Sequence, residues 1–163
     1  MKIGILCACE PEFEPYKTAL GCGEKAMCGA KHIEGRLCGQ DIAAVFCGLG
    51  KVNAAMAAEI LCLRYGVDLI LNAGVAGCLT DLPTGSLVVP DEFIQHDVDT
   101  TAVGDPIGLV STVNRVKFPT WKPEHCVEAL KRLGFSAVTG RVATGDWFAV
   151  KGERAAFIRD TFH

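Results

Sequence analysis

The chain has 163 residues, of which half are apolar and 21% are charged, so it can bury one substantial core and is not disordered. Its formal net charge of −3 comes from intermixed acids and bases, without the basic patch that nucleic acid or an anionic membrane attracts. We therefore expect a small-molecule or protein partner, with no nucleic acid and no membrane, and a single domain over residues 1–163.

The cysteine pattern favours a reduced compartment. The sequence contains nine cysteines but no CxxC pair. Cys7, Cys47, Cys62 and Cys78 lie within apolar runs, which is typical of small buried thiols. No ligand set has zinc-site spacing, so no metal is expected. The first apolar run is too short for a signal peptide and no run would span a bilayer, which predicts a cytoplasmic protein.

The predicted elements alternate between strands and helices along the chain. In order, they are a strand at residues 2–8, a helix from about residue 10, a hairpin with strands at 33–37 and 41–47, a helix at 52–65, strands at 67–72 and 87–89, a long loop at 95–121, a helix at 124–133, a strand at 136–143 and a helix at 152–162. The run 67–72 is continuously apolar, as in a parallel strand covered on both faces. Such alternation predicts an α/β sandwich.

The first glycine-rich segment is not a nucleotide loop. Gly48-Leu49-Gly50-Lys51 follows a predicted strand, but Val45 and Val52 stand where a Walker loop needs Gly and Ser or Thr. Asn53 likewise departs from the dinucleotide-binding fingerprint. The segment is interpreted as a tight turn between a strand and a helix.

Two further features lie at the predicted carboxyl ends of strands, where ligands of open α/β sheets bind. The small residues of the segment 72–77 either let a ligand approach the backbone or let a helix pack closely, and both interpretations stay open. Glu12 lies just past the first strand, where a carboxylate can activate a water molecule. Acids in a first helical turn are also explained by the helix dipole, as for Glu10 and Glu14.

Two aromatic or acidic segments have similar alternatives. Trp147 and Phe148, in the segment 144–148, provide either a stacking platform for a planar base or ordinary core aromatics. His96-Asp97-Val98-Asp99 either orients a ring, binds a cation or forms a local hydrogen-bonding device.

Taken together, five segments in one register give a far more specific signal than any one alone. They are Met1-Lys2-Ile3-Gly4-Ile5-Leu6 with Glu12, Gly48-Leu49-Gly50-Lys51-Val52, Asn72-Ala73-Gly74-Val75-Ala76-Gly77, His96-Asp97-Val98-Asp99 and Thr144-Gly145-Asp146-Trp147-Phe148. In order and spacing, essentially the whole chain resembles the 5'-methylthioadenosine/S-adenosylhomocysteine nucleosidases of the nucleoside phosphorylase superfamily.

The resemblance implies a three-layer sandwich, with a mixed, twisted sheet flanked by helices, that forms a homodimer and hydrolyses the N-glycosidic bond of an adenine nucleoside without a cofactor. Glu12 matches the residue that holds and activates the attacking water. Phe148 matches the ring that stacks on the purine, and Ala149 the neighbour whose backbone contacts the base edge. The remaining matched positions are Ala8, Val75 and Ala76 in the substrate site, and Thr100 and Val103 in a loop that enters the partner subunit's pocket.

The chain departs from the family pattern in two ways. Val75 stands where the nucleosidases usually have a serine that contacts the water and ribose region. The family also continues into a Met-Glu pair that binds the ribose and a Ser-Asp pair that protonates the purine, and neither occurs in these 163 residues. The resemblance thus implies a fold that is incomplete at the C-terminus. Cleavage needs a proton donor for the leaving purine and a proton acceptor for the attacking water. A site that has only the acceptor, Glu12, is therefore expected to be feeble.

Two rival functions stand beside this hydrolase activity. One is a phosphorolytic nucleoside phosphorylase of the same superfamily, which needs Arg and hydroxyl groups for a phosphate dianion. The other is a catalytically silent nucleoside-binding fragment. The acidic first turn and Val75 argue against the phosphorylase.

Overall fold

The computed structural model describes residues 1–162 and divides the chain into two compact units, Met1–Ala76 and the residues from Gly77 onward. The elements, in chain order, are β1 (Lys2–Cys7), α1 (Glu10–Leu20), β2 (Lys25–Met27), β3 (Ala30–Leu37), β4 (Gln40–Phe46), α2 (Lys51–Glu59), the π-helical turn η1 (Ile60–Arg64), β5 (Leu69–Asn72), β6 (Leu87–Gln95), the 3-10 turns η2 (Thr101–Val103) and η3 (Ser111–Val113), β7 (Lys117–Pro119), α3 (Pro123–Arg132), β8 (Ala137–Thr144) and α4 (Glu153–Phe162). Within this described range, no helix combines the length and apolar character needed to cross a bilayer.

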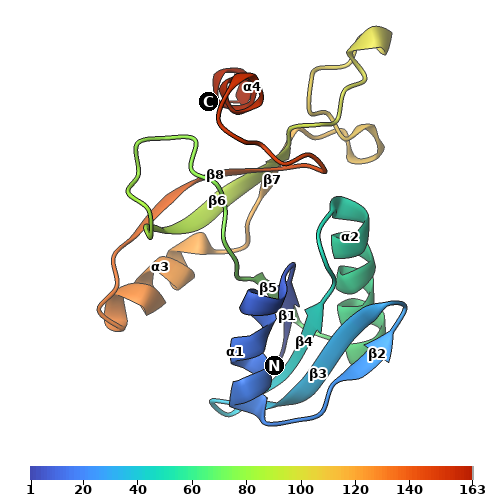
Figure 1. The fold of residues 1–163 in the computed structure, drawn as a ribbon, viewed down its shortest axis with the longest axis vertical. Coiled ribbons are helices and arrows are strands. Elements are labelled where there is room, and N and C mark those ends of the chain that lie inside the picture. The colour runs from blue at the N-terminus through green and yellow to red at the C-terminus, as the bar shows by residue number, and fades with distance from the viewer. Residues whose placement is uncertain (163) are drawn as a thin grey trace. The chain divides into compact units, whose positions relative to one another are not determined.

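The first unit is a five-stranded mixed sheet between helices (Figure 1). Its strand order is β2-β3-β4-β1-β5, with β1 parallel to both β4 and β5, and with β3 antiparallel to β2 and β4. The parallel pairing of three strands brings their carboxyl ends to one edge of the sheet. The α/β prediction is confirmed.

The two faces of this sheet separate by the alternation of side chains along each strand. Ile5 and Cys7 of β1 pack with Phe13 of α1 on one face. Leu6 of β1 packs with Leu61 of η1 on the other face, in the same cluster as the α2 side chains. Each face therefore has its own helix and its own apolar cluster, which makes the first unit a three-layer arrangement.

The predicted hairpin between β3 and β4 is confirmed and turns tightly. Cys38 and Gly39 have φ angles of 49° and 79°, so both occupy the left-handed region of a two-residue hairpin turn. The predicted helix 52–65 is also present, although its last part widens into the π-helical turn η1 before Gly66 ends it with φ 59°.

The second unit is built on a three-stranded sheet of order β7-β6-β8. Strands β6 and β8 are parallel, from Leu87 opposite Ala137 to Gln95 opposite Thr144. Ile94 of β6 is buried against Ile158 and Phe162 of α4. The last predicted helix and the strand before it are therefore confirmed, and the core of this unit lies between β6 and α4.

Several expectations about extent and burial were wrong. The strand expected at 87–89 continues to Gln95, and Leu87 at its start is 40% exposed. The run 67–72, expected to be covered on both faces, forms β5 at the edge of its sheet, where Leu71 and Asn72 are exposed. The loop expected at 95–121 contains β7, and β2 was missed altogether, because three-residue strands are fixed by their neighbours rather than by their own periodicity. Cys62 and Cys78 are exposed, unlike Cys7.

All nine cysteines are thiols, and none of them forms a disulfide. The division into two units does not test whether they fold as one domain, so a single domain over residues 1–163 stays a prediction.

Candidate functional site

The carboxyl edge of the five-stranded sheet gathers three backbone segments. They follow β1, β4 and β5 at residues 8–9, 47–50 and 73–76. The Cys47 N–H donates to the Cys7 carbonyl at 3.0 Å, and the Asn72 side-chain amide donates to the Leu6 carbonyl at 3.0 Å. These bonds tie the ends of β4 and β5 to β1. The backbone groups of the three segments therefore have fixed positions along this edge.

Glu12 fills this edge with its carboxylate. One oxygen, Oε2, accepts hydrogen bonds from the backbone N–H groups of Ala8 at 2.8 Å and Cys9 at 3.2 Å. The other oxygen, Oε1, accepts the Val75 N–H at 3.1 Å, across 63 residues of sequence. Three backbone donors from two strand ends thus fix both oxygens of one carboxylate. Hydrogen bonds of this kind, to an ionised acceptor, are stronger than neutral ones.

Gly74 is the residue that leaves room for this carboxylate. A Cβ atom built at Gly74 would lie 2.4 Å from Oε1 and 2.9 Å from Cδ of Glu12. Any side chain at position 74 would therefore displace the carboxylate. The segment 72–77 thus allows another group to lie close to its backbone. At Gly74, that group is the side chain of Glu12.

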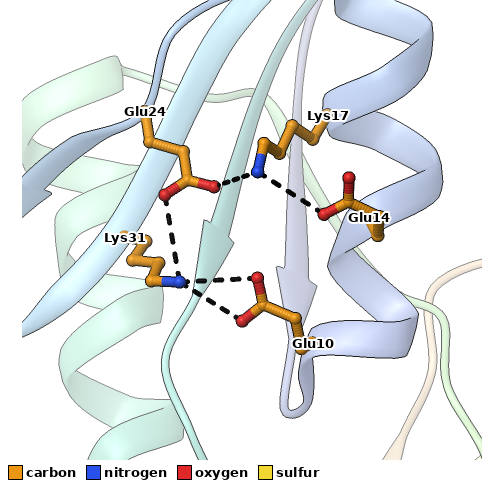
Figure 2. Close-up of polar contacts among 5 residues, drawn as sticks. All are labelled: Glu10, Glu14, Lys17, Glu24 and Lys31. Carbon is orange, nitrogen blue, oxygen red and sulfur yellow. Dashed lines mark hydrogen bonds and ion pairs between the residues drawn. The ribbon is translucent and has the colours of Figure 1, made fainter.

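Glu10 and Glu14, the other acids of α1, lie beside lysine side chains, as Figure 2 shows. Lys31 of β3 lies between Glu10 and Glu24, with its Nζ 3.3 Å and 3.9 Å from their carboxylates. Lys17 lies between Glu24 and Glu14, at 2.6 Å and 3.6 Å. These partly exposed pairs are individually weak, and the two lysines only partly offset the charges of the three carboxylates Glu10, Glu14 and Glu24. Glu12 differs from these acids because its carboxylate binds backbone N–H groups and, within residues 1–162, no lysine.

Two thiols beside Glu12 are held in their neutral form. Burial, followed by the negative charge of Glu12, raises the pKa of Cys7 to about 12. Burial also raises the pKa of Cys47 above its ordinary value. A thiol that stays protonated near pH 7 is a poor nucleophile. Neither Cys7 nor Cys47 is therefore a candidate nucleophile at this edge.

The remaining predicted residues of the first unit contribute through the backbone. The side chain of Val75 is 89% exposed, while its N–H binds Glu12. Ala76 is exposed next to it. Ala8 uses its N–H for the Glu12 carboxylate. The structure therefore brings together Ala8, Glu12 and Val75 from the predicted set.

In the second unit, the loop after β8 carries the predicted base-stacking residues. The Asp146 N–H donates to Oδ2 of Asp97 at 2.7 Å. The Trp147 ring lies edge-on to His96, with 4.7 Å between centroids, and stacks on Phe157 at 6.3 Å. Phe148, by contrast, is 83% exposed. Of the two aromatics that the sequence offered, Trp147 is packed and Phe148 presents its ring.

The other predicted positions of this unit lie in separate places. Ala149 packs beside the Ile94 cluster of the core. Thr100 donates its hydroxyl to Asp105 at 2.8 Å, and Val103 is exposed in the turn η2. Val103 therefore lies on an exposed turn, and Thr100 directly before this turn is half-buried. Over residues 1–162, no cluster of three or more His, Cys, Asp or Glu side chains has an arrangement for a metal ion.

The comparisons with known proteins agree with this architecture. Residues 2–163 match the family model of the phosphorylase superfamily. A 5'-methylthioadenosine/S-adenosylhomocysteine nucleosidase from Geobacillus kaustophilus is 37% identical over 99% of this chain and 71% of its own length. For two Shewanella nucleosidases, the chain spans 64% and 72% of their length.

Solved structures give the same result. The nucleosidase of Colwellia psychrerythraea in complex with adenine has a TM-score of 0.90 at 37% identity, over 99% of this chain and 69% of that one. Futalosine hydrolase of Helicobacter pylori has a TM-score of 0.91 at 29% identity, over 99% of this chain and 71% of that one. The chain belongs to the phosphorylase superfamily and, within it, to the family of 5'-methylthioadenosine/S-adenosylhomocysteine nucleosidases.

Proposed function

We propose that this chain provides the water-activating and base-stacking residues of a nucleosidase that hydrolyses the N-glycosidic bond of adenine nucleosides such as methylthioadenosine and S-adenosylhomocysteine. The observation that carries the proposal is the Glu12 carboxylate, held on both oxygens by the N–H groups of Ala8, Cys9 and Val75. The identity of 37% to a nucleosidase over nearly the whole chain supports the same activity.

The chemistry assigned to Glu12 is general base catalysis. Hydrolysis of an N-glycoside passes through an oxocarbenium-like state, which a water molecule attacks at the anomeric carbon while it loses a proton. A carboxylate whose orientation is fixed by three donors is preorganised to take that proton. The leaving purine also needs a proton, and this role is assigned to no residue of the chain.

The same geometry favours water over phosphate as the nucleophile. A phosphorylase binds a phosphate dianion through positive charges and hydrogen-bond donors. Here the backbone donors at the strand ends already bind the carboxylate of Glu12, so an incoming dianion would meet a negative charge in place of those donors. The hydrolytic branch therefore fits this edge better than the phosphorolytic one.

For the base, we assign stacking to Phe148 because its ring is exposed, while the ring of its neighbour Trp147 is packed on His96. Ala149 provides the neighbouring backbone, while Val75 and Ala76 line the ribose side, as the family pattern implies. Thr100 and Val103 are assigned to the partner's pocket of a homodimer. A cytoplasmic location is part of the same proposal.

The test uses the natural polypeptide that contains residues 1–163. It is incubated with methylthioadenosine and S-adenosylhomocysteine, with and without phosphate, and the products are separated by chromatography. The proposal expects free adenine and a free sugar at a rate that phosphate does not change. Strict dependence on phosphate, with a sugar 1-phosphate as product, identifies a phosphorylase. Adenine binding without turnover identifies the silent alternative.

A further inference from the structure

The segment His96-Asp97 has a defined position relative to the loop that carries Phe148. Strands β6 and β8 are parallel and end together, with Gln95 opposite Thr144. The next residues of both strands consequently emerge at the same edge of this sheet. The His96 N–H continues the ladder by donating to the Thr144 carbonyl at 3.0 Å. Asp97 and Asp146 follow directly, and Oδ2 of Asp97 accepts the Asp146 N–H at 2.7 Å.

Gly145 shows how closely the two segments meet. A Cβ atom at this position would lie 2.4 Å from Cε1 of His96 and 2.9 Å from Cγ of Asp97. The backbone at Gly145 therefore rests against both side chains at once. His96 itself is buried, with 4% of its surface exposed, so it cannot easily move aside.

Trp147 completes the attachment of the loop. Its ring contacts His96 edge-on, at an interplanar angle of 86°, and stacks on Phe157 of α4 at 24°. The Arg154 guanidinium lies 4.9 Å from the Trp147 ring centroid. Asp146 is thus held by its N–H and Trp147 by its ring, and the next residue, Phe148, is left with its ring exposed.

We propose that Asp97 is a positioning residue for nucleoside binding: it fixes the loop 145–149 through the Asp146 N–H, so that Trp147 stays packed on His96 and Phe148 presents its ring to the base. This inference rests on the proposed function for the role of Phe148, but the fixing of the loop does not depend on it. Asp97 acts through the loop and is not assigned a contact with the substrate.

The experiment compares Asp97→Ala with Asp97→Asn. Alanine removes the acceptor of the Asp146 N–H, whereas the asparagine side-chain carbonyl can still accept it. Two readouts are used, namely the dissociation constant for adenine by calorimetry and the accessibility of Trp147 to iodide quenching. Since the chain has two tryptophans, Trp121→Phe leaves Trp147 as the sole tryptophan, which is excited selectively over the two tyrosines. Asp91→Ala, which removes an exposed acid within β6, is the control.

We expect Asp97→Ala to weaken adenine binding by about fivefold to tenfold, the size of one lost hydrogen bond to a charged acceptor at a partly exposed site. It should also raise the quenching of Trp147, while Asp97→Asn stays within about twofold of the parent and Asp91→Ala changes neither readout. Each variant must show a cooperative thermal transition.

Unchanged quenching and unchanged adenine affinity in Asp97→Ala would overturn the proposal, as would equal losses in the alanine and asparagine variants. If the parent chain binds no adenine, the role of Phe148 in the proposed function fails. Trp147 quenching then decides by itself whether Asp97 fixes the loop.

Discussion

Gly74→Ala separates the contact with Glu12 from any effect on the backbone. The φ angle of Gly74 lies outside the left-handed region, so alanine is allowed there by its backbone. The three heavy atoms nearest to the added Cβ all belong to the Glu12 carboxyl group, with Oε1 at 2.4 Å. Because ordinary contact begins near 3.4 Å, the carboxylate must move by about 1 Å.

That displacement removes the hydrogen bond of 3.1 Å from the Val75 N–H and weakens the two others. A hydrogen bond to a charged group contributes about 1.5–3 kcal/mol, and partial exposure of this site reduces the estimate to roughly 1–2 kcal/mol. For a chain of this size the melting temperature should fall by about 2–8 °C. If Glu12 is the base, a shift of about 1 Å should also lower the hydrolysis rate about a hundredfold.

Thermal unfolding of a double-mutant cycle tests this reasoning. In a Glu12→Ala background the added methyl group no longer meets a carboxylate, so Gly74→Ala should cost only a few tenths of a kcal/mol there. Gly77→Ala is the stability control, since nothing lies within 4 Å of its added Cβ. Equal costs of Gly74→Ala in both backgrounds would refute the assignment of its effect to Glu12.

Three further predictions concern single groups. Phe148→Ala should raise the adenine dissociation constant about threefold to tenfold in calorimetry, from the lost stacking contact, whereas the exposed Trp121→Ala should not. Burial lowers the pKa of His32 below its ordinary value of 6.5. The stability that neutral His32 contributes is therefore complete above pH 6.5 and is lost as the pH falls below 6.5. Urea midpoints between pH 8 and 5.5 should show this slope, and His32→Leu should flatten it. The hydrogen bond from Arg141 lowers the pKa of Glu92 from 4.5, so its contribution is present above about pH 4.5 and is lost on further acidification. Glu92→Gln should remove that acid-side loss from the thermal unfolding curves, and an unchanged slope in either variant would contradict the cause given for it.

Most of the elements were predictable because their signals are local. The apolar run before Glu10-Pro11-Glu12 predicted β1 and α1, and Cys38-Gly39 predicted the β3–β4 turn. The position of Glu12 past the end of β1 was also predictable, but only the resemblance to the nucleosidases distinguished it from Glu10 and Glu14 as a catalytic acid.

The contacts that define the site were not predictable in the same way. The bond between Glu12 and Val75 spans 63 residues, and it depends on β5 lying parallel to β1. A glycine at position 74 is compatible with a turn, a ligand or a helix, so only the structure shows that its space is taken by a carboxylate. The same holds for Asp97 and Asp146, whose pairing follows from the register of β6 and β8.

Burial was the least predictable property. An apolar run shows that a segment can be covered, but not that it is covered at both ends, as the exposed start of β6 shows. Cys62 lies in an apolar helix and is nevertheless exposed, because a helix buries only one of its sides. The periodicity of apolar residues can predict whether a segment is a helix or a strand. Its burial depends on which other parts of the chain pack against it.

The most direct test of the central claim is the turnover of methylthioadenosine by Glu12→Gln, measured in the natural polypeptide together with its affinity for adenine. Glutamine keeps the shape of the side chain but does not accept a proton from water. The account predicts that kcat falls about a hundredfold or more, while the adenine dissociation constant stays within about threefold of the parent value. Unchanged turnover in Glu12→Gln would contradict the account and would reduce Glu12 to an acid that binds backbone N–H groups at the start of α1.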